Sequence, residues 1–290
     1  MIGKINDKVR KLYGRTTSSL SGRLASPTLI HQEFSRLQNA VRAAEPENLA
    51  GNGFKVYLQN DEDGIIEAIF DRIEGGETYC EIGVEDGREC NTHYLALKGW
   101  RGAWIEGSPT MCARIESDLG GRDFPKHFKL LEEMVDCDNI VSLYRRVTSF
   151  LGVHDLDFFS LDIDGNDLYV LDTLLKSGSA PVVICVEYNG KFPPPLSISV
   201  AYDKNRNWLR DDHFGASLQA FHDLLSAKGY GLITCNITGA NAFYVRSDKK
   251  DRFKLSEPKA VWRPLRLELC PLPASHRPGM GFLRERLQNV

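Results

Sequence analysis

The sequence lacks the marks of a membrane, secreted or nucleic-acid-binding protein. No uninterrupted apolar run approaches the ~20 residues needed to span a bilayer, and no positively charged stretch followed by an apolar run opens the chain. The 36 Lys and Arg residues are balanced by 39 Asp and Glu residues, and the net charge of −3 creates no field that would gather nucleic acid. We therefore expect a cytoplasmic protein whose partner is not nucleic acid.

The sequence also lacks paired cysteines. Its seven cysteines are an odd number, scattered without the spacing of a disulfide framework or a zinc cluster. Cys80, Cys185 and Cys235 lie inside strand-like runs, where a thiol behaves as a small apolar group. We expect these thiols to be core residues.

The length and composition fit a single catalytic core. A chain of 290 residues with 42% hydrophobic residues is long enough for one α/β domain with extensions and too short for two large domains. We divide it into an N-terminal helical extension (1–54), a central domain (55–250) and a C-terminal tail (251–290). The extension contains an amphipathic helical segment, Leu29 to Ala44, which we expect to be a packing helix or a dimer contact, the alternative being a substrate lid. The tail either wraps the core or contacts a second subunit.

Within the central domain, strand-like and helix-like segments alternate. This is the pattern of a mostly parallel sheet with helices on both faces. An acidic segment, Asn60–Gly64, precedes the apolar run Ile65–Phe70 and predicts a capped helix start. The helix after Gly87 is expected to end near Gly99. The last two strands are predicted to form a hairpin at the sheet edge. The predicted strands lie in residues 79–82, 103–106, 127–131, 156–165, 181–186, 230–236 and 241–246, and further helices at 168–175 and 217–228.

The turn Glu81–Gly87 is the most informative segment of the chain. Glu81 closes an apolar strand, and Gly83 and Gly87 flank the acidic pair Glu85 and Asp86 before a helix. Glycines let the backbone approach a ligand, and a helix N-terminus supplies free N–H donors, so this arrangement predicts a nucleotide-cofactor cradle.

The acidic residues of this turn decide which cofactor fits. A dinucleotide carries a pyrophosphate, and a like-charge contact at about 4 Å costs on the order of 4 kcal/mol at an effective dielectric near 20. S-adenosylmethionine (SAM) carries an ammonium, a sulfonium and a ribose diol but no phosphate, so carboxylates stabilise it. A G-x-G-x-x-G run is also absent. We therefore predict a SAM site and not a NAD site.

Carboxylates follow two further strands. Glu106 ends the next strand, roughly twenty residues beyond the turn, where doubly wound folds bind ribose hydroxyls. In the turn Glu133–Asp136, we expect Val135 to pack on the adenine ring and Asp136 to accept a hydrogen bond from its amino group. Asp162 and Asp164 follow a buried strand, at the edge where open α/β sheets bind ligands.

Taken in order, these motifs make the chain similar to the FkbM-type family of SAM-dependent methyltransferases. The resemblance covers about Gln59 to Asp248 and lies in Glu81–Gly87, Gly99–Glu106, Asp157–Asp167, Glu187–Asn189, Phe214–Leu218 and Gly239–Arg246. It implies a Rossmann-like class I fold with seven strands, the last antiparallel. It also implies that Glu81, Gly83 and Gly87 surround the methionyl part of SAM and that Glu106 binds the ribose. From its place in the same acidic turn, we expect Glu85 to bind the cofactor as well. Relatives methylate hydroxyls, often on sugars or natural products. One departure is Val84 and Glu85, where relatives commonly have alanine and asparagine.

The chemistry of such a reaction needs alignment of the acceptor and removal of its proton. Asp162 and Asp164 are the candidate catalytic residues, because alternation along a strand places both on one face. Together with Glu187, and with Asn189 as a further oxygen ligand, they could hold Mg²⁺. In the alternative interpretation, Asp162 orients the SAM amino group and Asp164 or Asp167 caps the next helix. His213 is a second candidate base, and a surface histidine without a role is its alternative.

A long loop, Gly190–Gly215, is predicted to be the lid over the acceptor. Long loops within compact domains tend to be functional, and this one contains Tyr202 and Trp208, which either stack on a sugar or pack within the loop. The main functional alternative is a SAM-binding scaffold or regulatory protein without turnover.

Overall fold

The computed structural model describes residues 27–57, 60–121, 124, 126–206, 211–269 and 279–288. Residues 1–26 of the expected N-terminal extension therefore lie outside the described residues, as does Trp208. Among the described residues, no helix has both the length and the apolarity needed to cross a bilayer.

A single seven-stranded sheet organises the described chain. Its strand order is β3-β2-β1-β4-β5-β7-β6, and only β7 runs antiparallel to its neighbours β5 and β6. The predicted seven strands and the reversed last strand are thus confirmed. The hairpin differs in one detail, because β7 inserts between β5 and β6 and leaves β6 at the edge. The strands are β1 (Thr78–Ile82), β2 (Arg101–Glu106), β3 (Phe128–Glu132), β4 (Phe158–Leu161), β5 (Val183–Glu187), β6 (Tyr230–Cys235) and β7 (Asn241–Arg246).

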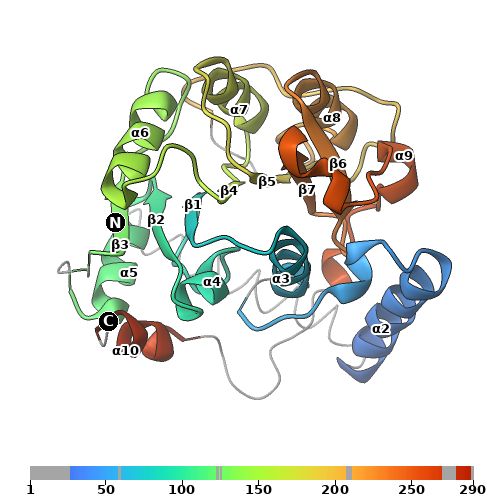
Figure 1. The fold of residues 1–290 in the computed structure, drawn as a ribbon, viewed down its shortest axis with the longest axis horizontal. Helices are drawn as coiled ribbons and strands as arrows, with labels where there is room; N and C mark the ends of the chain where they lie inside the picture. The colour runs from blue at the N-terminus through green and yellow to red at the C-terminus, as the bar shows by residue number, and fades with distance from the viewer. Residues whose placement is uncertain are drawn as a thin grey trace.

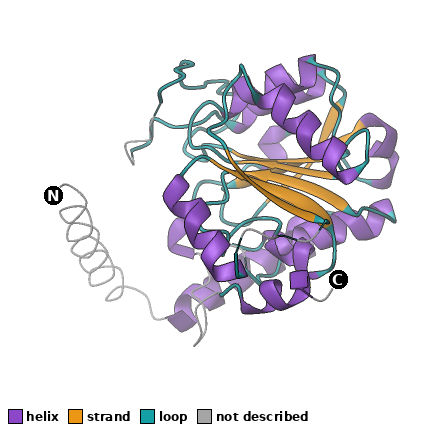
Figure 2. Ribbon diagram, turned by 90° about the vertical axis from the view of Figure 1, so that its left-hand side faces the viewer, coloured by secondary structure: helices purple, strands orange, loops and turns teal. Residues whose placement is uncertain are grey.

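Helices cover both faces of this sheet (Figure 2). One apolar cluster joins the sheet to α6, α7 and α8, and a second joins its other face to α3, α4, α5 and α10, as Figure 1 shows from the end of the sheet. The helices are α2 (Pro27–Ala44), α3 (Glu62–Ile73), α4 (His93–Leu97), α5 (Pro109–Leu119), α6 (Ile140–Leu151), α7 (Asp167–Lys176), α8 (Leu218–Ala227), α9 (Pro258–Val261) and α10 (Gly281–Gln288), with 3-10 turns η1 (Leu49–Asn52), η2 (Ser247–Arg252) and η3 (Leu267–Leu269).

Local sequence explains where several helices begin. Ser108 accepts a hydrogen bond from Met111 N at 3.4 Å and is followed by a proline in the first turn of α5, and Ser217 caps α8 in the same way. The predicted start of α3 is confirmed, but the side chain of its N-cap, Asp61, makes no capping hydrogen bond. Asp63, in the first turn of α3, binds the segment before the helix instead. Its Oδ2 accepts hydrogen bonds from Val56 N and Tyr57 N at 2.7 and 3.0 Å.

The two ends of the described chain pack against the domain. Phe34 of α2 and Ala50 of η1 form a small apolar cluster with Ile237, which lies in the turn between β6 and β7. At the other end, Leu283 and Leu287 of α10 are buried in the cluster beneath α4 and α5. The segment after β7 thus completes the covering of one sheet face.

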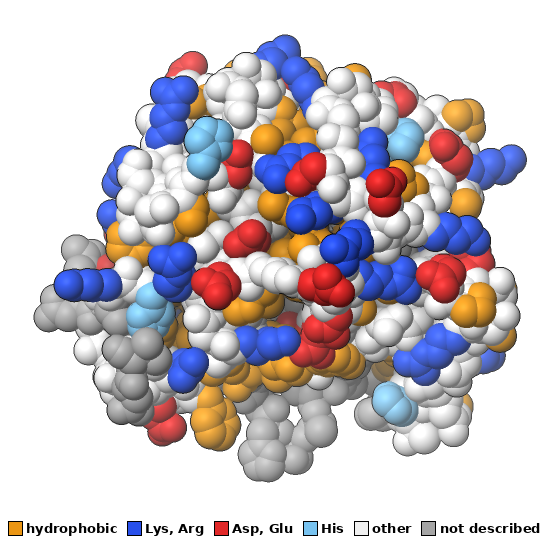
Figure 3. Space-filling view, in the orientation of Figure 1, with side chains coloured by type: hydrophobic (Ala, Val, Ile, Leu, Met, Phe, Trp, Pro, Cys, Tyr) orange, Lys and Arg blue, Asp and Glu red, His pale blue; other side chains and the backbone are white. Residues whose placement is uncertain are grey.

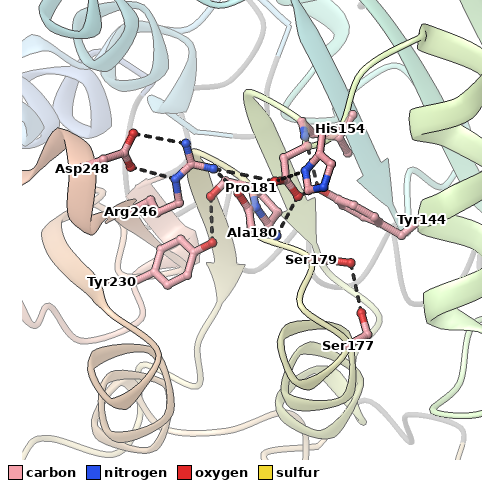
Figure 4. Close-up of polar contacts among 11 residues, drawn as sticks. Tyr144, His154, Ser177, Ser179, Ala180, Pro181, Tyr230, Arg246 and Asp248 are labelled. Atoms are coloured by element: carbon pink, nitrogen blue, oxygen red, sulfur yellow. Dashed lines mark hydrogen bonds and ion pairs between the residues drawn. The ribbon is translucent and has the colours of Figure 1, made fainter.

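Polar contacts fasten the edge of the sheet at which β5 begins (Figure 4). Tyr230 donates to Pro181 O at 2.8 Å, and Arg246 pairs with Asp248 at 2.7 Å while also donating to Ala180 O. Ala180 N in turn donates to Asp155 at 2.7 Å. These hydrogen bonds pair polar groups at the end of the sheet where the parallel strands begin. The candidate site lies at the other end of the sheet, where the parallel strands end.

Charges of both signs are interspersed over the face shown in Figure 3. The even mixture agrees with the small net charge of −3.

Candidate cofactor and catalytic site

Glu81, the last polar residue of β1, is fully engaged within the protein. Its Oε1 accepts from Asn91 N at 2.7 Å, and its Oε2 accepts from Thr92 N and Thr92 Oγ1 at 2.8 and 2.7 Å. The free N–H donors expected at the start of the helix are therefore taken by Glu81. The prediction also placed that helix too early, because residues 83–92 form a loop and α4 begins only at His93. Burial raises the pKa of Glu81 to about 7 despite these hydrogen bonds.

Gly83 and Gly87 are required by the packing of the chain itself. Both have a positive φ, of 85° and 73°. A Cβ at Gly83 would lie 1.6 Å from the main-chain oxygen of Asp162, and one at Gly87 would lie 2.7 Å from the ring of Trp104. Glu85 between them also adopts a positive φ of 50° without being glycine. The turn therefore brings the end of β1 against the end of β4.

Glu106 joins this turn to the end of β2. Its Oε2 accepts from Glu85 N at 2.9 Å and its Oε1 from Ser108 N at 2.7 Å. Each carboxylate oxygen keeps a second lone pair, which leaves capacity for a ligand diol. Burial raises the pKa of Glu106, and the charge of Glu85 raises it further. Glu106 thus both shapes the turn and faces a neighbouring carboxylate.

The acidic turn after β3 is held by the long loop. Asp136 Oδ1 accepts from Asp138 N and Asn139 N, and its Oδ2 pairs with Lys204 Nζ at 2.9 Å. Lys204 also contacts Asp138 at 2.6 Å. Burial acts to raise the pKa of Asp136, but the hydrogen bond and charge of Lys204, together with the hydrogen bonds from Asp138 N and Asn139 N, hold that pKa below its usual value. Val135 is buried in the apolar cluster that includes α6, and its packing on an adenine ring stays a prediction.

Three carboxylates converge after β4 and β5. One oxygen each of Asp162, Asp164 and Glu187 lies within 4.8 Å of the others, and all three side chains are partly buried. The convergence agrees with the sequence prediction, although the reason differs. β4 ends at Leu161 and Asp164 has a φ of 57°, so a turn and not strand alternation brings Asp164 back to Asp162.

Burial and mutual repulsion shift the pKa values of this group. The pKa of Asp162 is raised well above its usual value by burial and by Glu187, and that of Glu187 is raised to about 8 by burial and by Asp164. The pKa of Asp164 is raised to about 6 by burial, Asp167 and Glu85. The charge of Glu85 thus reaches both Asp164 and Glu106, and carboxylates from four strand ends share one region.

Two neighbouring side chains have structural tasks. Asp167 accepts from Ile163 N at 2.8 Å and from Gly165 N at 2.9 Å, so it holds the turn that carries Asp164. The amide of Asn189 donates to Asp212 O and Phe214 O, both at 3.0 Å, and accepts from Lys191 N. Asn189 therefore anchors the long loop, which differs from its predicted role as a further metal ligand.

The long loop places the remaining candidates at the surface. His213 is exposed, and its main-chain N–H donates a hydrogen bond to Asp211 Oδ1 at 3.1 Å. Tyr202 packs edge-on against Tyr169 of α7 with ring centroids 5.6 Å apart. The base role of His213 and the sugar-stacking role of Tyr202 stay predictions.

Several residues of the site were not predicted from the sequence. Asn91 donates to Ser160 Oγ on β4 at 2.9 Å, and Thr92 accepts from Trp104 Nε1 at 2.7 Å. Lys204 and Glu62 also join elements at this edge. Single polar residues in loops form no periodic pattern, so only their partners in space reveal them.

The strand order and the reversed β7 define the Rossmann-like class I methyltransferase fold. No protein-family model and no curated protein matches the chain. Among solved structures, the chain is similar to the O-methyltransferase from Bacillus cereus in complex with SAH, at 17% identity over 73% of this chain and 89% of that chain, with a TM-score of 0.42.

Two further solved structures are similar at the same level. They are the O-methyltransferase TomG from Streptomyces achromogenes, involved in tomaymycin synthesis and in complex with SAM (16% identity, 73% and 89% of the two chains, TM-score 0.41), and an S-adenosylmethionine-dependent methyltransferase from Clostridium acetobutylicum (12%, 74% and 98%, TM-score 0.39). At these identities the chemistry has to be argued from the site itself.

Proposed function

We propose that this protein is a SAM-dependent O-methyltransferase of the FkbM type that acts on a hydroxyl of a sugar or natural product. The observation that carries the proposal is the gathering of carboxylates at the ends of adjacent strands. Besides burial, the charge of Glu85 raises the pKa of Glu106 and of Asp164, and the charge of Asp164 raises the pKa of Glu187. A ligand with a sulfonium and an ammonium relieves that repulsion, whereas a pyrophosphate increases it.

The cofactor is expected to lie across the ends of β1, β2 and β3. Glu106 has lone pairs left for the ribose diol, and Gly83, Glu85 and Gly87 line the turn for the methionyl part, with Glu81 supporting that turn from below. Val135 and Asp136 would edge the adenine. Because Lys204 now pairs with Asp136 Oδ2, adenine binding would require that side chain to share or release Asp136.

In the reaction, the acceptor oxygen attacks the methyl carbon of SAM. The carbon–sulfur bond breaks, its electron pair stays on sulfur to give S-adenosylhomocysteine, and the hydroxyl proton goes to a carboxylate. Asp162 is the proposed acceptor of that proton, with Asp164 beside it and His213 as the second candidate base. Because burial and Glu187 raise the pKa of Asp162, its ionised form has a higher proton affinity than that of an ordinary aspartate.

The same carboxylates fit a divalent cation. Asp162, Asp164 and Glu187 offer three oxygen ligands within 4.8 Å of one another, which suits Mg²⁺. When bound, Mg²⁺ would lower the proton affinity of the attacking hydroxyl. Asp162, Asp164 and Glu187 would then fix the position of the acceptor by holding the ion that its oxygens contact.

The test is release of S-adenosylhomocysteine from SAM with a panel of monosaccharides, polyols and phenols, with and without EDTA. We expect turnover with at least one hydroxyl acceptor and a loss of about 100-fold or more in Asp162→Asn. Asp172→Asn, which removes a surface ion pair with Lys176 on α7, is the matched control and should keep full activity. Saturable SAM binding without any turnover would favour the scaffold alternative, and an unchanged rate in Asp162→Asn would refute the assigned base.

A further inference from the structure

Glu62, the first residue of α3, is a completely buried carboxylate at the candidate site's edge of the sheet. Its Oε1 accepts three side-chain amide donors, from Asn60, Asn236 and Asn241, at 3.0, 2.6 and 2.9 Å. Asn236 follows β6 and Asn241 begins β7. Glu62 therefore ties the start of α3 to the ends of two strands.

This contact fixes the orientation of the Asn241 amide. Glu62 Oε1 accepts hydrogen bonds from all three amides, so Asn241 turns Nδ2 toward Glu62 and Oδ1 away from it. Asn236 shows the contrast, because its Oδ1 accepts from Ala240 N at 2.9 Å and from Asn241 N at 3.0 Å. Asn241 Oδ1 is buried and accepts no hydrogen bond from any described residue, in a side chain that is only 8% exposed.

The sheet register places Asn241 beside Glu187, one of the three converging carboxylates. Asn241 lies directly opposite Glu187 in the β5–β7 ladder. Residues directly opposite each other in an antiparallel pair project to the same face, with Cβ atoms about 4.5–5.5 Å apart. Glu62 accepts the hydrogen bond from Nδ2 of the Asn241 amide. We therefore infer that Oδ1 of the same amide faces Glu187 and the neighbouring Asp162.

We propose that Asn241 Oδ1 is the fourth protein ligand of a divalent cation bound by Asp162, Asp164 and Glu187, and that Glu62 is the positioning residue that orients it. The inference rests on the proposed cation site and replaces Asn189, whose amide is engaged by the loop. Three carboxylates and an amide carbonyl form an all-oxygen set, the ligand type preferred by Mg²⁺ and Mn²⁺. A cation gives the buried carbonyl its missing partner.

The test is Mn²⁺ binding to the full chain, measured by electron paramagnetic resonance without SAM or acceptor. We expect Asn241→Leu to weaken Mn²⁺ binding at least about tenfold. Glu62→Gln, which keeps an amide oxygen for the three donors, should stay within about threefold, and Glu62→Leu should approach the effect of Asn241→Leu. Asn39→Leu, on the exposed side of α2, is the control for the substitution itself.

A second measurement covers variants that fail to fold. Crystals of the unaltered protein soaked in MnCl₂ should show anomalous density in contact with Asn241 Oδ1. Density bounded by Asn189 instead, a wild-type Mn²⁺ affinity in folded Asn241→Leu, or no Mn²⁺ binding by the unaltered protein would overturn the proposal. Calorimetry with S-adenosylhomocysteine, run in parallel, separates this failure from failure of the proposed cofactor site.

Discussion

The Cα of Gly83 lies against the main-chain carbonyl of Asp162, so close that a Cβ on residue 83 would be 1.6 Å from that oxygen. The relationship is reinforced on either side of the glycine. Gly83 N donates to Ile105 O at 2.9 Å, and Asp162 N donates to Ile82 O at 3.1 Å. These backbone contacts position the candidate cofactor turn against the strand end that carries the candidate catalytic residues.

We predict that Gly83→Ala is strongly destabilising. A positive φ costs a residue with a Cβ roughly 1–3 kcal/mol, and the overlap with a backbone atom has no side chain to relieve it. The expected loss in the free energy of unfolding is on the order of 4 kcal/mol, measured by urea denaturation. Gly75→Ala is the control, because nothing lies within 4 Å of a Cβ there. Equal stability of the two variants would contradict the contact.

A second prediction concerns the pH dependence of stability through His93. This buried side chain donates from Nδ1 to Gly87 O at 2.9 Å and stacks on Tyr57 with ring centroids 4.0 Å apart. Burial lowers the pKa of His93 from 6.5 to about 4, because the protonated ring would lose its hydration. Between about pH 6.5 and 4, His93 is therefore protonated in the unfolded chain and neutral in the folded chain.

Stability should accordingly be lost as the pH falls from about 6.5 to 4, by an amount on the order of 3 kcal/mol from this residue alone. Urea denaturation of the unaltered protein and of His93→Phe, at a series of pH values, measures the difference in slope. His213→Gln, at an exposed histidine, should keep the wild-type slope. Parallel curves for the unaltered protein and His93→Phe would show that His93 does not contribute.

A third prediction concerns the long loop. Lys204 joins the loop to Asp136 and Asp138, and the hydrogen bond from Asn166 Nδ2 to Asp203 O at 2.8 Å supports the same segment. We expect Lys204→Met to speed amide hydrogen exchange in residues 201–206 by about two- to fivefold, and high salt to have a similar effect. Lys191→Met removes an ion pair with Asp212 inside the loop and should leave this segment unchanged. Unchanged exchange in Lys204→Met would mean that the ion pair does not hold the loop.

The fold was largely predictable from the sequence. Alternating apolar runs gave the seven strands, and the reversed β7 followed from the family resemblance. The exact start of α4 was not predictable, since the loop from Val84 to Thr92 is held by Glu81 and no local pattern records that contact. The position of α10 was equally hidden, because its buried Leu283 and Leu287 belong to a short segment with a weak periodicity.

The acidic residues of the candidate site were predictable from the sequence, but the hydrogen-bond partners of the side chains around them were not. Strand ends with a carboxylate, such as Glu106 and Asp162, stand out in a sequence because charge interrupts an apolar run. The engagement of Asn189 by the loop and the freedom of Asn241 Oδ1 depend on which amide meets which acceptor. Such choices arise from tertiary structure, and sequence spacing does not encode them.

Glu106 allows the sharpest test of the cofactor site by mutation. Both of its oxygens accept a main-chain N–H, and Gln can offer an oxygen on one side only. We predict that Glu106→Gln weakens binding of S-adenosylhomocysteine by about tenfold or more, through the loss of one acceptor at the turn and of charge near the ribose. Glu132→Gln, at the paired position on β3, is the control. Equal affinities would remove Glu106 from the site.

We propose that the carboxylates after the parallel strands bind SAM and not a dinucleotide. Isothermal titration calorimetry of the unaltered protein, with SAM and with NAD in separate runs, distinguishes the two cofactors. We expect saturable, one-site heat with SAM and none with NAD. Saturable binding of NAD without heat from SAM would refute a SAM site here.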